Sequence, residues 1–198
     1  LEKSGGDRVL AMDLHSAQIQ GYFDIPCDHI YGSPVLIDYL ETLKLEEVVV
    51  VSPDVGGVAR ARAFAKQMKD APLAIIDKRR AAHNIAESLT VIGEVKGKTA
   101  ILIDDMIDTG GTICSGAHLL KKEGAKRIFA CASHAVFSPP SCERLSTEDL
   151  FEQVIVTNSI PIFVKNNFPQ LKVLSVANML GEAIWRIHEE SSVSSMFR

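Results

Sequence analysis

Two adjacent acids and a glycine-rich turn follow an apolar run in the segment 101–112. The turn opens a stretch with helical spacing, so its backbone N–H groups and threonine hydroxyls could surround an anion at the helix start. The two acids can accept hydrogen bonds from vicinal sugar hydroxyls. Together these groups suit a ribose 5-phosphate, whereas the alternative interpretation is a tight strand-to-helix turn with solvated acids. The candidate residues are Asp104, Asp105, Asp108, Thr109, Gly110, Gly111 and Thr112.

Apolar, β-branched runs alternate with helical patterns along the chain, which predicts an α/β fold. We expect strands at 9–14, 48–52, 73–77, 99–104, 128–133, 154–157 and 173–177, and helices at 58–68, 113–122 and 179–189. Strands that are apolar on both faces and separated by helices indicate a mostly parallel, Rossmann-like sheet covered on both sides. In such sheets, ligands bind in loops at the carboxyl ends of strands. The stretches 78–90, 138–146 and 191–195 are expected to be the least structured.

The composition is typical of a globular protein. Hydrophobic residues make up 46% of the 198 residues, and 21 Lys and Arg against 25 Asp and Glu leave a net charge of −4. This mildly acidic balance argues against nucleic-acid binding, and no apolar run reaches the ~20 residues of a membrane span. The full P-loop pattern G-x-x-x-x-G-K-[ST] and the G-x-G-x-x-G of dinucleotide folds are absent. Four cysteines without metal-ligand spacing predict reduced thiols in an intracellular compartment, either the cytoplasm or an organelle such as a plastid.

The run Asp-Asp-x-x-x-Thr-Gly-Gly-Thr at 104–112 resembles the signature of the type I phosphoribosyltransferase superfamily. Further segments resemble the ribose-phosphate pyrophosphokinase family, whose members make phosphoribosyl pyrophosphate (PRPP). These segments are 13–26, 31–34, 52–57, 76–80 and 192–197. They occur in the family's order, so the resemblance covers essentially the whole chain.

The resemblance implies transfer of the pyrophosphoryl group of MgATP to the C1 hydroxyl of ribose 5-phosphate, giving PRPP and AMP. Lys78 and Arg80 match catalytic residues of a flexible loop, and Arg80 is also expected to contact substrate. His15 and Asp54 match positions associated with magnesium, although imidazole is an unusual ligand for a hard cation. A loop that holds the transferred diphosphate matches Asp54, Val55, Gly56 and Gly57.

Three residues near the C-terminus, Ser192, Ser194 and Phe197, match a regulatory site for phosphate or ADP, which implies activation by phosphate. A frayed tail is the alternative interpretation of this segment. His134 ends a predicted strand and is a further candidate to line the site.

The resemblance also implies how the chain is organised. Residues 33–181 match a ribose 5-phosphate-binding domain, whereas 1–32 and 182–198 match part of a second, similar domain. Members of the family form homo-oligomers of dimers grouped into hexamers, and they share ATP between subunits. We therefore expect the chain to be part of a longer protein, to bind ribose 5-phosphate and to turn over poorly by itself.

Two other functions are compatible with the sequence. A phosphoribosyltransferase that consumes PRPP would share the ribose loop, but it has no need of the segment 13–26 or of Lys78 and Arg80. A non-catalytic subunit associated with PRPP synthetase would regulate an active homologue, and it would be expected to lose the catalytic loop.

Overall fold

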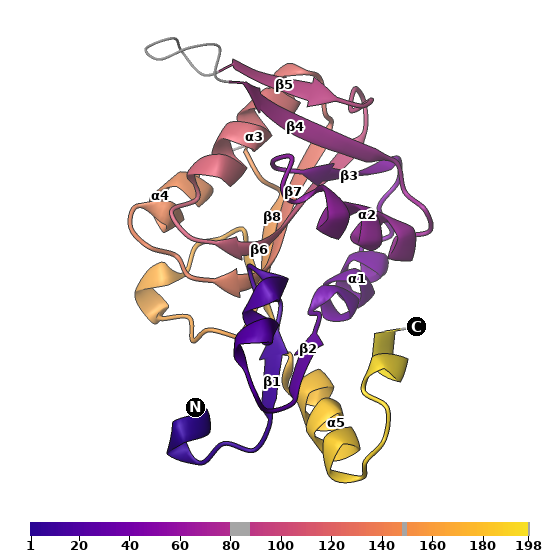
Figure 1. Ribbon diagram of the computed structural model, residues 1–198. Coiled ribbons are helices and arrows are strands. Elements are labelled where there is room, and N and C mark those ends of the chain that lie inside the picture. Colours follow the sequence, from indigo (N-terminus) through magenta and orange to yellow (C-terminus); the bar gives the residue numbers. More distant parts are fainter. Residues whose placement is uncertain (80–87, 148–149, 198) are drawn as a thin grey trace.

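A seven-stranded sheet forms the centre of the molecule (Figure 1). The structure, a computed structural model, describes residues 1–79, 88–147 and 150–197. The strands of this sheet are β3 (Val48–Ser52), β4 (Leu73–Arg79), β5 (Ser88–Ile92), β6 (Thr99–Ile107), β7 (Arg127–Ala135), β8 (Gln153–Thr157) and β9 (Leu171–Leu174). Their order is β5-β4-β3-β6-β7-β8-β9, and β5 alone runs antiparallel to its neighbour. The predicted α/β fold with a mostly parallel sheet is confirmed.

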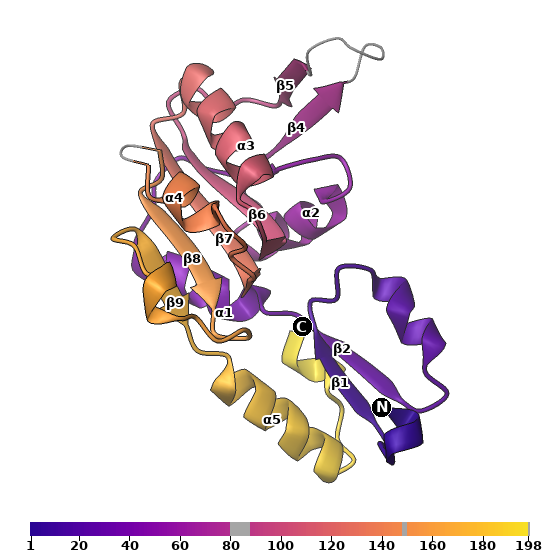
Figure 2. The same ribbon diagram turned by 90° about the vertical axis from the view of Figure 1, so that its left-hand side faces the viewer.

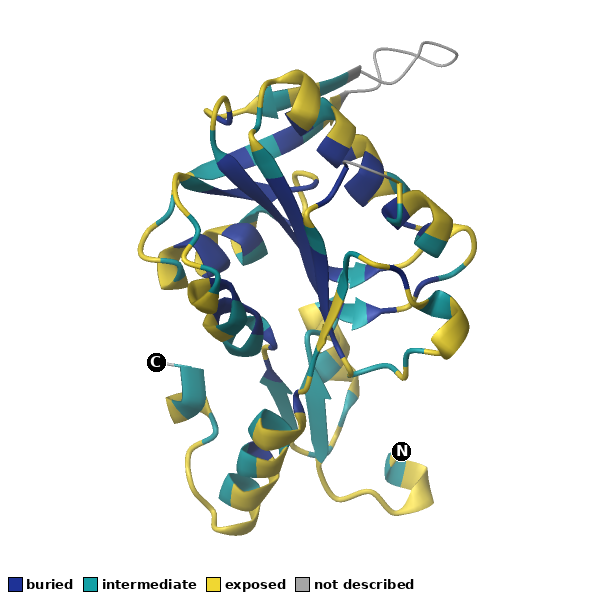
Figure 3. Ribbon diagram, turned by 180° about the vertical axis from the view of Figure 1, so that it is seen from behind, coloured by how far each residue is buried: buried dark blue, intermediate teal, exposed yellow. Residues whose placement is uncertain are grey.

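Helices cover both faces of the sheet. On one face lie α1 (Ser33–Thr42) and α2 (Val58–Gln67), and on the other lie α3 (Gly111–Lys122) and α4 (Ser141–Leu145) (Figures 1 and 2). In β6, Ala100 and Leu102 pack on the α3 side, whereas Ile101 packs on the α1 side. Because both faces of a central strand meet helices, the buried run of such a strand, for example 100–103 in β6, is continuously apolar rather than alternating (Figure 3).

A separate pair of parallel strands, β1 (Val9–Met12) and β2 (Cys27–Ile30), lies at the end of the molecule where the large sheet's parallel strands finish (Figure 2). The last helix, α5 (Ala177–His188), lies at this same end. Short 3-10 helices complete the described chain, and they are η1 (Glu2–Ser4), η2 (Ala17–Tyr22), η3 (Val164–Asn166) and η4 (Ser194–Phe197). None of the helices in the described ranges is long and apolar enough to cross a bilayer.

Several predicted boundaries are wrong. The strand predicted at 99–104 continues to Ile107, so the two acids lie inside β6 rather than after it. The stretch 78–90 contains the end of β4 and the start of β5, and 138–146 contains α4. The strand predicted at 173–177 is β9, which begins two residues earlier and ends three residues earlier, because Val176 already precedes the first turn of α5.

Candidate functional site

The glycine turn joins β6 to α3 at the carboxyl edge of the sheet, as predicted. Gly110 precedes the first residue of α3 and has φ +73°, a left-handed conformation in which glycine carries no penalty. The turn surrounds a cavity of about 130 Å³, and the residues that line it include Asp104 and the whole run 106–113. An anion in this cavity would lie at the N-terminus of a twelve-residue helix, where the helix dipole favours negative charge.

The two acids at the end of β6 differ in their surroundings. The Asp104 side chain is 21% exposed, and its Oδ1 accepts a hydrogen bond from Arg60 Nη1 at 2.8 Å. The Asp105 side chain is only 2% exposed, and its Oδ1 lies 3.4 Å from the same Arg60 nitrogen. Arg60 is on α2, the helix that follows the predicted diphosphate loop at 54–57 (the Asp54 turn). Its guanidinium therefore links this helix to both acids.

Opposite pKa shifts follow from these surroundings. Burial, together with a hydrogen bond to Asp105, raises the pKa of Asp104 to about 7. Burial also acts to raise the pKa of Asp105, but hydrogen bonds with Asp104 and His15 and the charge of Arg60 lower this pKa overall. Near neutral pH the pair therefore keeps Asp105 as a carboxylate, while Asp104 is poised to gain or lose a proton.

The Asp54 turn closes on itself through its own side chain. Asp54 Oδ1 accepts the backbone N–H of Gly57 at 2.8 Å, and Ser52 Oγ donates to the Asp54 carbonyl at 2.6 Å. Val55 and Gly56 are exposed at the top of this turn, next to the start of α2. The predicted diphosphate loop is thus a formed turn at a helix start, on the strand adjacent to β6.

His15 reaches this edge from the separate strand pair. Its Nδ1 lies 2.8 Å from Asp105 Oδ2, although 74% of the imidazole side chain is exposed. The structure therefore pairs His15 with Asp105 and not with Asp54, and within the described residues no hydrogen bond or ion pair joins His15 to Asp54.

A polar junction fixes the backbone ahead of His15. Asp13 Oδ2 accepts the Gly32 N–H at 2.7 Å and also the hydroxyl of Ser133. A Cβ on Gly32 would lie 2.9 Å from Ser133 Oγ, so only glycine permits this approach. His134 Nε2 lies 3.0 Å from the Met12 carbonyl and 3.1 Å from that of Asp13, so this nitrogen carries the hydrogen. His134 thus secures the junction.

The structure describes one of the two catalytic residues that the resemblance predicts. Lys78 is exposed, and it lies within β4, paired with Leu89 of β5, instead of in a loop after the strand. Antiparallel pairing with β5 extends β4, because Leu89 and Val91 of β5 pack on the core beside it. Arg80 lies outside the described residues.

The predicted regulatory residues lie in a segment held by side-chain contacts. Arg186 Nη1 donates to the Ser192 carbonyl at 3.2 Å and to Ser195 Oγ at 2.7 Å, and Ser192 Oγ lies 3.0 Å from Ser194 Oγ. The Phe197 ring makes an edge contact with Tyr31, with ring centroids 6.1 Å apart. These contacts argue against a frayed tail, but they do not test regulation.

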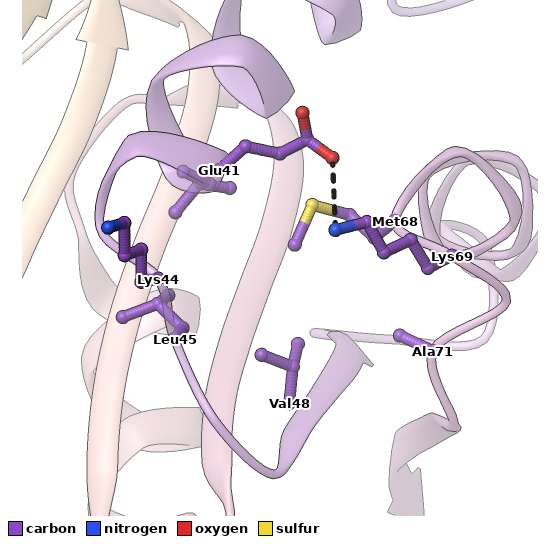
Figure 4. Close-up of a pocket in the computed structure, with 8 residues that line it drawn as sticks. Glu41, Lys44, Leu45, Val48, Met68, Lys69 and Ala71 are labelled. Carbon is purple, nitrogen blue, oxygen red and sulfur yellow. Dashed lines mark ion pairs between the residues drawn. The ribbon is translucent and has the colours of Figure 1, made fainter.

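A second hollow, of about 270 Å³, lies at the opposite end of the sheet, where β3 begins (Figure 4). Its floor is apolar and includes Leu45, Val48 and Met68, and at its rim Glu41 Oε1 lies 3.8 Å from Lys69 Nζ. Both charged side chains are well exposed, so their ion pair contributes little. The polar groups described above all gather at the other edge.

Sequence reasoning missed Arg60 and Ser133. Arg60 could have been found from its position, because it lies three residues after Gly57, in the first turn of a helix that starts at the carboxyl edge of the sheet. Ser133 is the last residue of the strand predicted at 128–133 and lies within β7, but its partner Asp13 is 120 residues away. The sequence gives no sign of that distant contact.

The fold and this edge together define an α/β domain of the phosphoribosyltransferase-like class. An adenine phosphoribosyltransferase (APRTase) from Giardia lamblia shares this fold, with a TM-score of 0.50 at 13% identity over 63% of this chain and 75% of that one. The model of the phosphoribosyl synthetase-associated domain matches residues 81–198, more than half of the chain, and the chain belongs to this family.

Two longer proteins are much more similar. A ribose-phosphate pyrophosphokinase of Prochlorococcus marinus subsp. pastoris is 92% identical over all 198 residues, which cover 60% of that protein. The crystal structure of phosphoribosylpyrophosphate synthetase from Mycobacterium smegmatis has a TM-score of 0.89 at 44% identity, over 96% of this chain and 61% of that one. The predicted resemblance is confirmed, and the chain spans about 60% of the length of these relatives.

Proposed function

We propose that this chain forms the ribose 5-phosphate- and diphosphate-binding part of an enzyme that makes PRPP and AMP from MgATP and ribose 5-phosphate. The observation that carries the proposal is the convergence of three elements at one edge. These are the glycine turn before α3, the acids at the end of β6, and the Asp54 turn before α2, joined through Arg60. The glycine turn suits the 5-phosphate, the acids at the end of β6 suit the vicinal hydroxyls of the sugar, and the Asp54 turn suits the second phosphate group.

In the proposed reaction, the C1 hydroxyl oxygen of the sugar bonds to the β-phosphorus of ATP. The bond between that phosphorus and the oxygen of the α-phosphate breaks, AMP leaves, and the hydroxyl proton is released. Asp104 and Asp105 would orient the ring by accepting its hydroxyl hydrogens. Lys78 and Arg80 would neutralise charge on the transferred group. Such reactions depend mainly on positioning and electrostatic stabilisation.

Magnesium fits this edge only as an ion held mainly by the substrates. Among the described residues no group of three or more His, Cys, Asp or Glu side chains could hold a metal ion by itself. The carboxylates of Asp54 and Asp104 offer the oxygen ligands that Mg²⁺ prefers, and it retains phosphate and water oxygens besides. His15, already paired with Asp105, would contact the nucleotide phosphates or their metal. Bound magnesium would neutralise phosphate charge.

The comparisons favour pyrophosphoryl transfer over the two other functions. The relative at 92% identity carries the name ribose-phosphate pyrophosphokinase, whereas the phosphoribosyltransferase neighbour shares the fold at 13% identity. Lys78 and Arg80, which a PRPP-consuming enzyme would not need, are both present in the sequence. The same residues argue against a subunit that has lost its catalytic loop.

We also infer a second domain and an oligomer. Residues 1–32 and 182–198 would belong to a second domain, a division supported by the separate β1–β2 sheet, although position 182 falls inside α5. On α5, Ile184 and Trp185 are 59% and 56% exposed, which suits further contacts within a homo-oligomer of dimers. Ser192, Ser194 and Phe197 would form a regulatory phosphate or ADP site.

The binding part of the proposal is tested by calorimetric titration of the chain. Ribose 5-phosphate should bind, whereas ribose, which lacks the phosphate, and glucose 6-phosphate, which has a different ring, should bind at least tenfold more weakly. Replacing Thr112 by Val removes one hydroxyl at the start of α3 and should weaken binding of ribose 5-phosphate several-fold. Equal affinity for the three sugars would contradict the proposal.

A further inference from the structure

The phosphate turn is braced from behind by a side chain that lies outside its motif. Arg144, on the short helix α4, donates from Nη1 to the carbonyl oxygen of Thr109 at 3.1 Å. The same nitrogen lies 3.5 Å from the position of a Cβ built on Gly111. Ser141, three residues before Arg144, and Leu145, the residue after it, each have a side-chain atom 3.6 Å from the corresponding position on Gly110. Helix α4 therefore packs directly against the back of the turn.

The Thr109 carbonyl shares a peptide unit with the N–H of Gly110. In a planar trans peptide the C=O and N–H bonds point in opposite directions. A donor that holds the carbonyl toward α4 therefore directs the Gly110 N–H away from α4. The cavity lies on that side, because its lining includes residues 108–113 and none of the residues of α4.

Because residue 110 is a glycine, the backbone alone does not fix the orientation of the Thr109–Gly110 peptide. Its φ of +73° is left-handed, and a glycine exchanges this conformation with others at little cost. A peptide next to such a residue needs an external contact to hold one orientation. Arg144 supplies that contact, and its positive charge reaches the first turn of α3, where it acts against the burial that raises the pKa of the Cys114 thiol.

We propose that Arg144 is a positioning residue for the phosphate site, holding the Thr109–Gly110 peptide so that the Gly110 N–H donates to the 5-phosphate of the sugar. This inference rests on the proposed function, since it assigns a sugar phosphate to the cavity. Arg144 touches the turn and not the substrate. Its loss should therefore weaken phosphate binding by loosening a donor that remains present in the chain.

The test compares Arg144→Met, which keeps the aliphatic stem, with Arg144→Lys, which keeps the charge but not the planar fork. Arg127→Met is the matched control, because Arg127 pairs with Glu152 at the far end of β7. Calorimetric titration with ribose 5-phosphate should show a dissociation constant about tenfold higher for Arg144→Met, the loss expected for one hydrogen bond. Arg144→Lys should lie between this variant and the parent chain, and Arg127→Met should match the parent.

A second readout separates positioning from stability alone. In the parent chain, the amide proton of Gly110 should move downfield in the NMR spectrum when ribose 5-phosphate binds, and this shift should shrink in both Arg144 variants. If Arg144→Met does not fold, the lysine variant decides the matter by the same signal. Parent-like affinity and an unchanged Gly110 shift in the variants would overturn the role of Arg144 alone. A parent chain that binds no ribose 5-phosphate would overturn this role and the proposed function together.

Discussion

His15 Nδ1 lies 2.8 Å from Asp105 Oδ2, across 90 residues of sequence. The imidazole comes from the segment after β1, and the carboxylate is buried near the end of β6. Arg60 lies on the other side of the same acid, with Nη1 3.4 Å from Asp105 Oδ1. One buried carboxylate thus ties the N-terminal strand pair, the central sheet and α2 to a single edge.

The acid pair predicts a stability that depends on pH. Asp104 keeps its proton up to a pKa of about 7, whereas in the unfolded chain the proton leaves near 3.8. Between these values the folded state binds more protons, so the contribution of Asp104 to the free energy of unfolding falls as pH rises. Asp104→Asn should flatten the change between pH 5 and pH 8 by roughly 1–3 kcal/mol, measured by urea denaturation.

Asp105 acts in the opposite direction. Its pKa is lowered, so its contribution to stability is present above the ordinary value and is lost as pH falls through the lowered one.

The experiment on Asp104→Asn needs a control at an exposed acid. Asp38, on α1, provides it, and Asp38→Asn should leave the curve between pH 5 and pH 8 unchanged. Identical pH dependence in Asp104→Asn and the parent chain would refute the assignment.

Alanine variants of two glycines can distinguish an effect of backbone strain on stability from an effect on ligand binding. Gly110 and Gly97 have φ of +73° and +76°, so alanine at either position should lower the free energy of unfolding by about 1 kcal/mol. A Cβ at Gly97 would meet nothing within 4 Å, and Gly97 lies in the turn before β6, away from the phosphate turn. Only Gly110→Ala should also weaken binding of ribose 5-phosphate, by tenfold or more. Equal affinities in the two variants would show that the turn is not the phosphate site.

The junction at Asp13 predicts local rather than global opening. Ser133→Ala removes the hydroxyl that donates to Asp13 and should cost about 1–3 kcal/mol, because the Asp13 carboxylate is left with one fewer donor. Hydrogen exchange of amides in β1 and β2 should accelerate, while that of β6 stays slow. Ser115→Ala, at an exposed position of α3, should change neither. Uniform acceleration in all strands would mean that the junction stabilises the whole domain instead.

The elements predicted best from the sequence are those that a local hydrophobic pattern determines. The strands β3, β6, β7 and β8 were found because burial on both faces leaves continuous apolar runs. Strand β5 was missed, since an edge strand that reads Ser-Leu-Thr-Val-Ile alternates and was taken for part of a loop. Helix α1 was missed because Ser33-Pro34 was interpreted only as part of a family motif.

The candidate site divides in the same way. Both glycine turns could be predicted, because a strand, a small-residue turn and a helix are consecutive in sequence. The pairing of His15 with Asp105, and the contacts of Arg60 and Arg144, join residues 35 to 90 positions apart. Such contacts depend on the packing of whole elements. No periodicity or spacing within one segment encodes them.

The most direct test of the proposed reaction is an analysis of its products. The chain, preceded by the segment that its longer relatives carry, is supplied with ribose 5-phosphate, MgATP and inorganic phosphate, and AMP is separated from ADP. We predict AMP and PRPP in equal amounts, with the rate lowered at least a hundredfold by Lys78→Ala, because a charge near the transferred group is lost. Formation of ADP and a sugar bisphosphate would contradict pyrophosphoryl transfer.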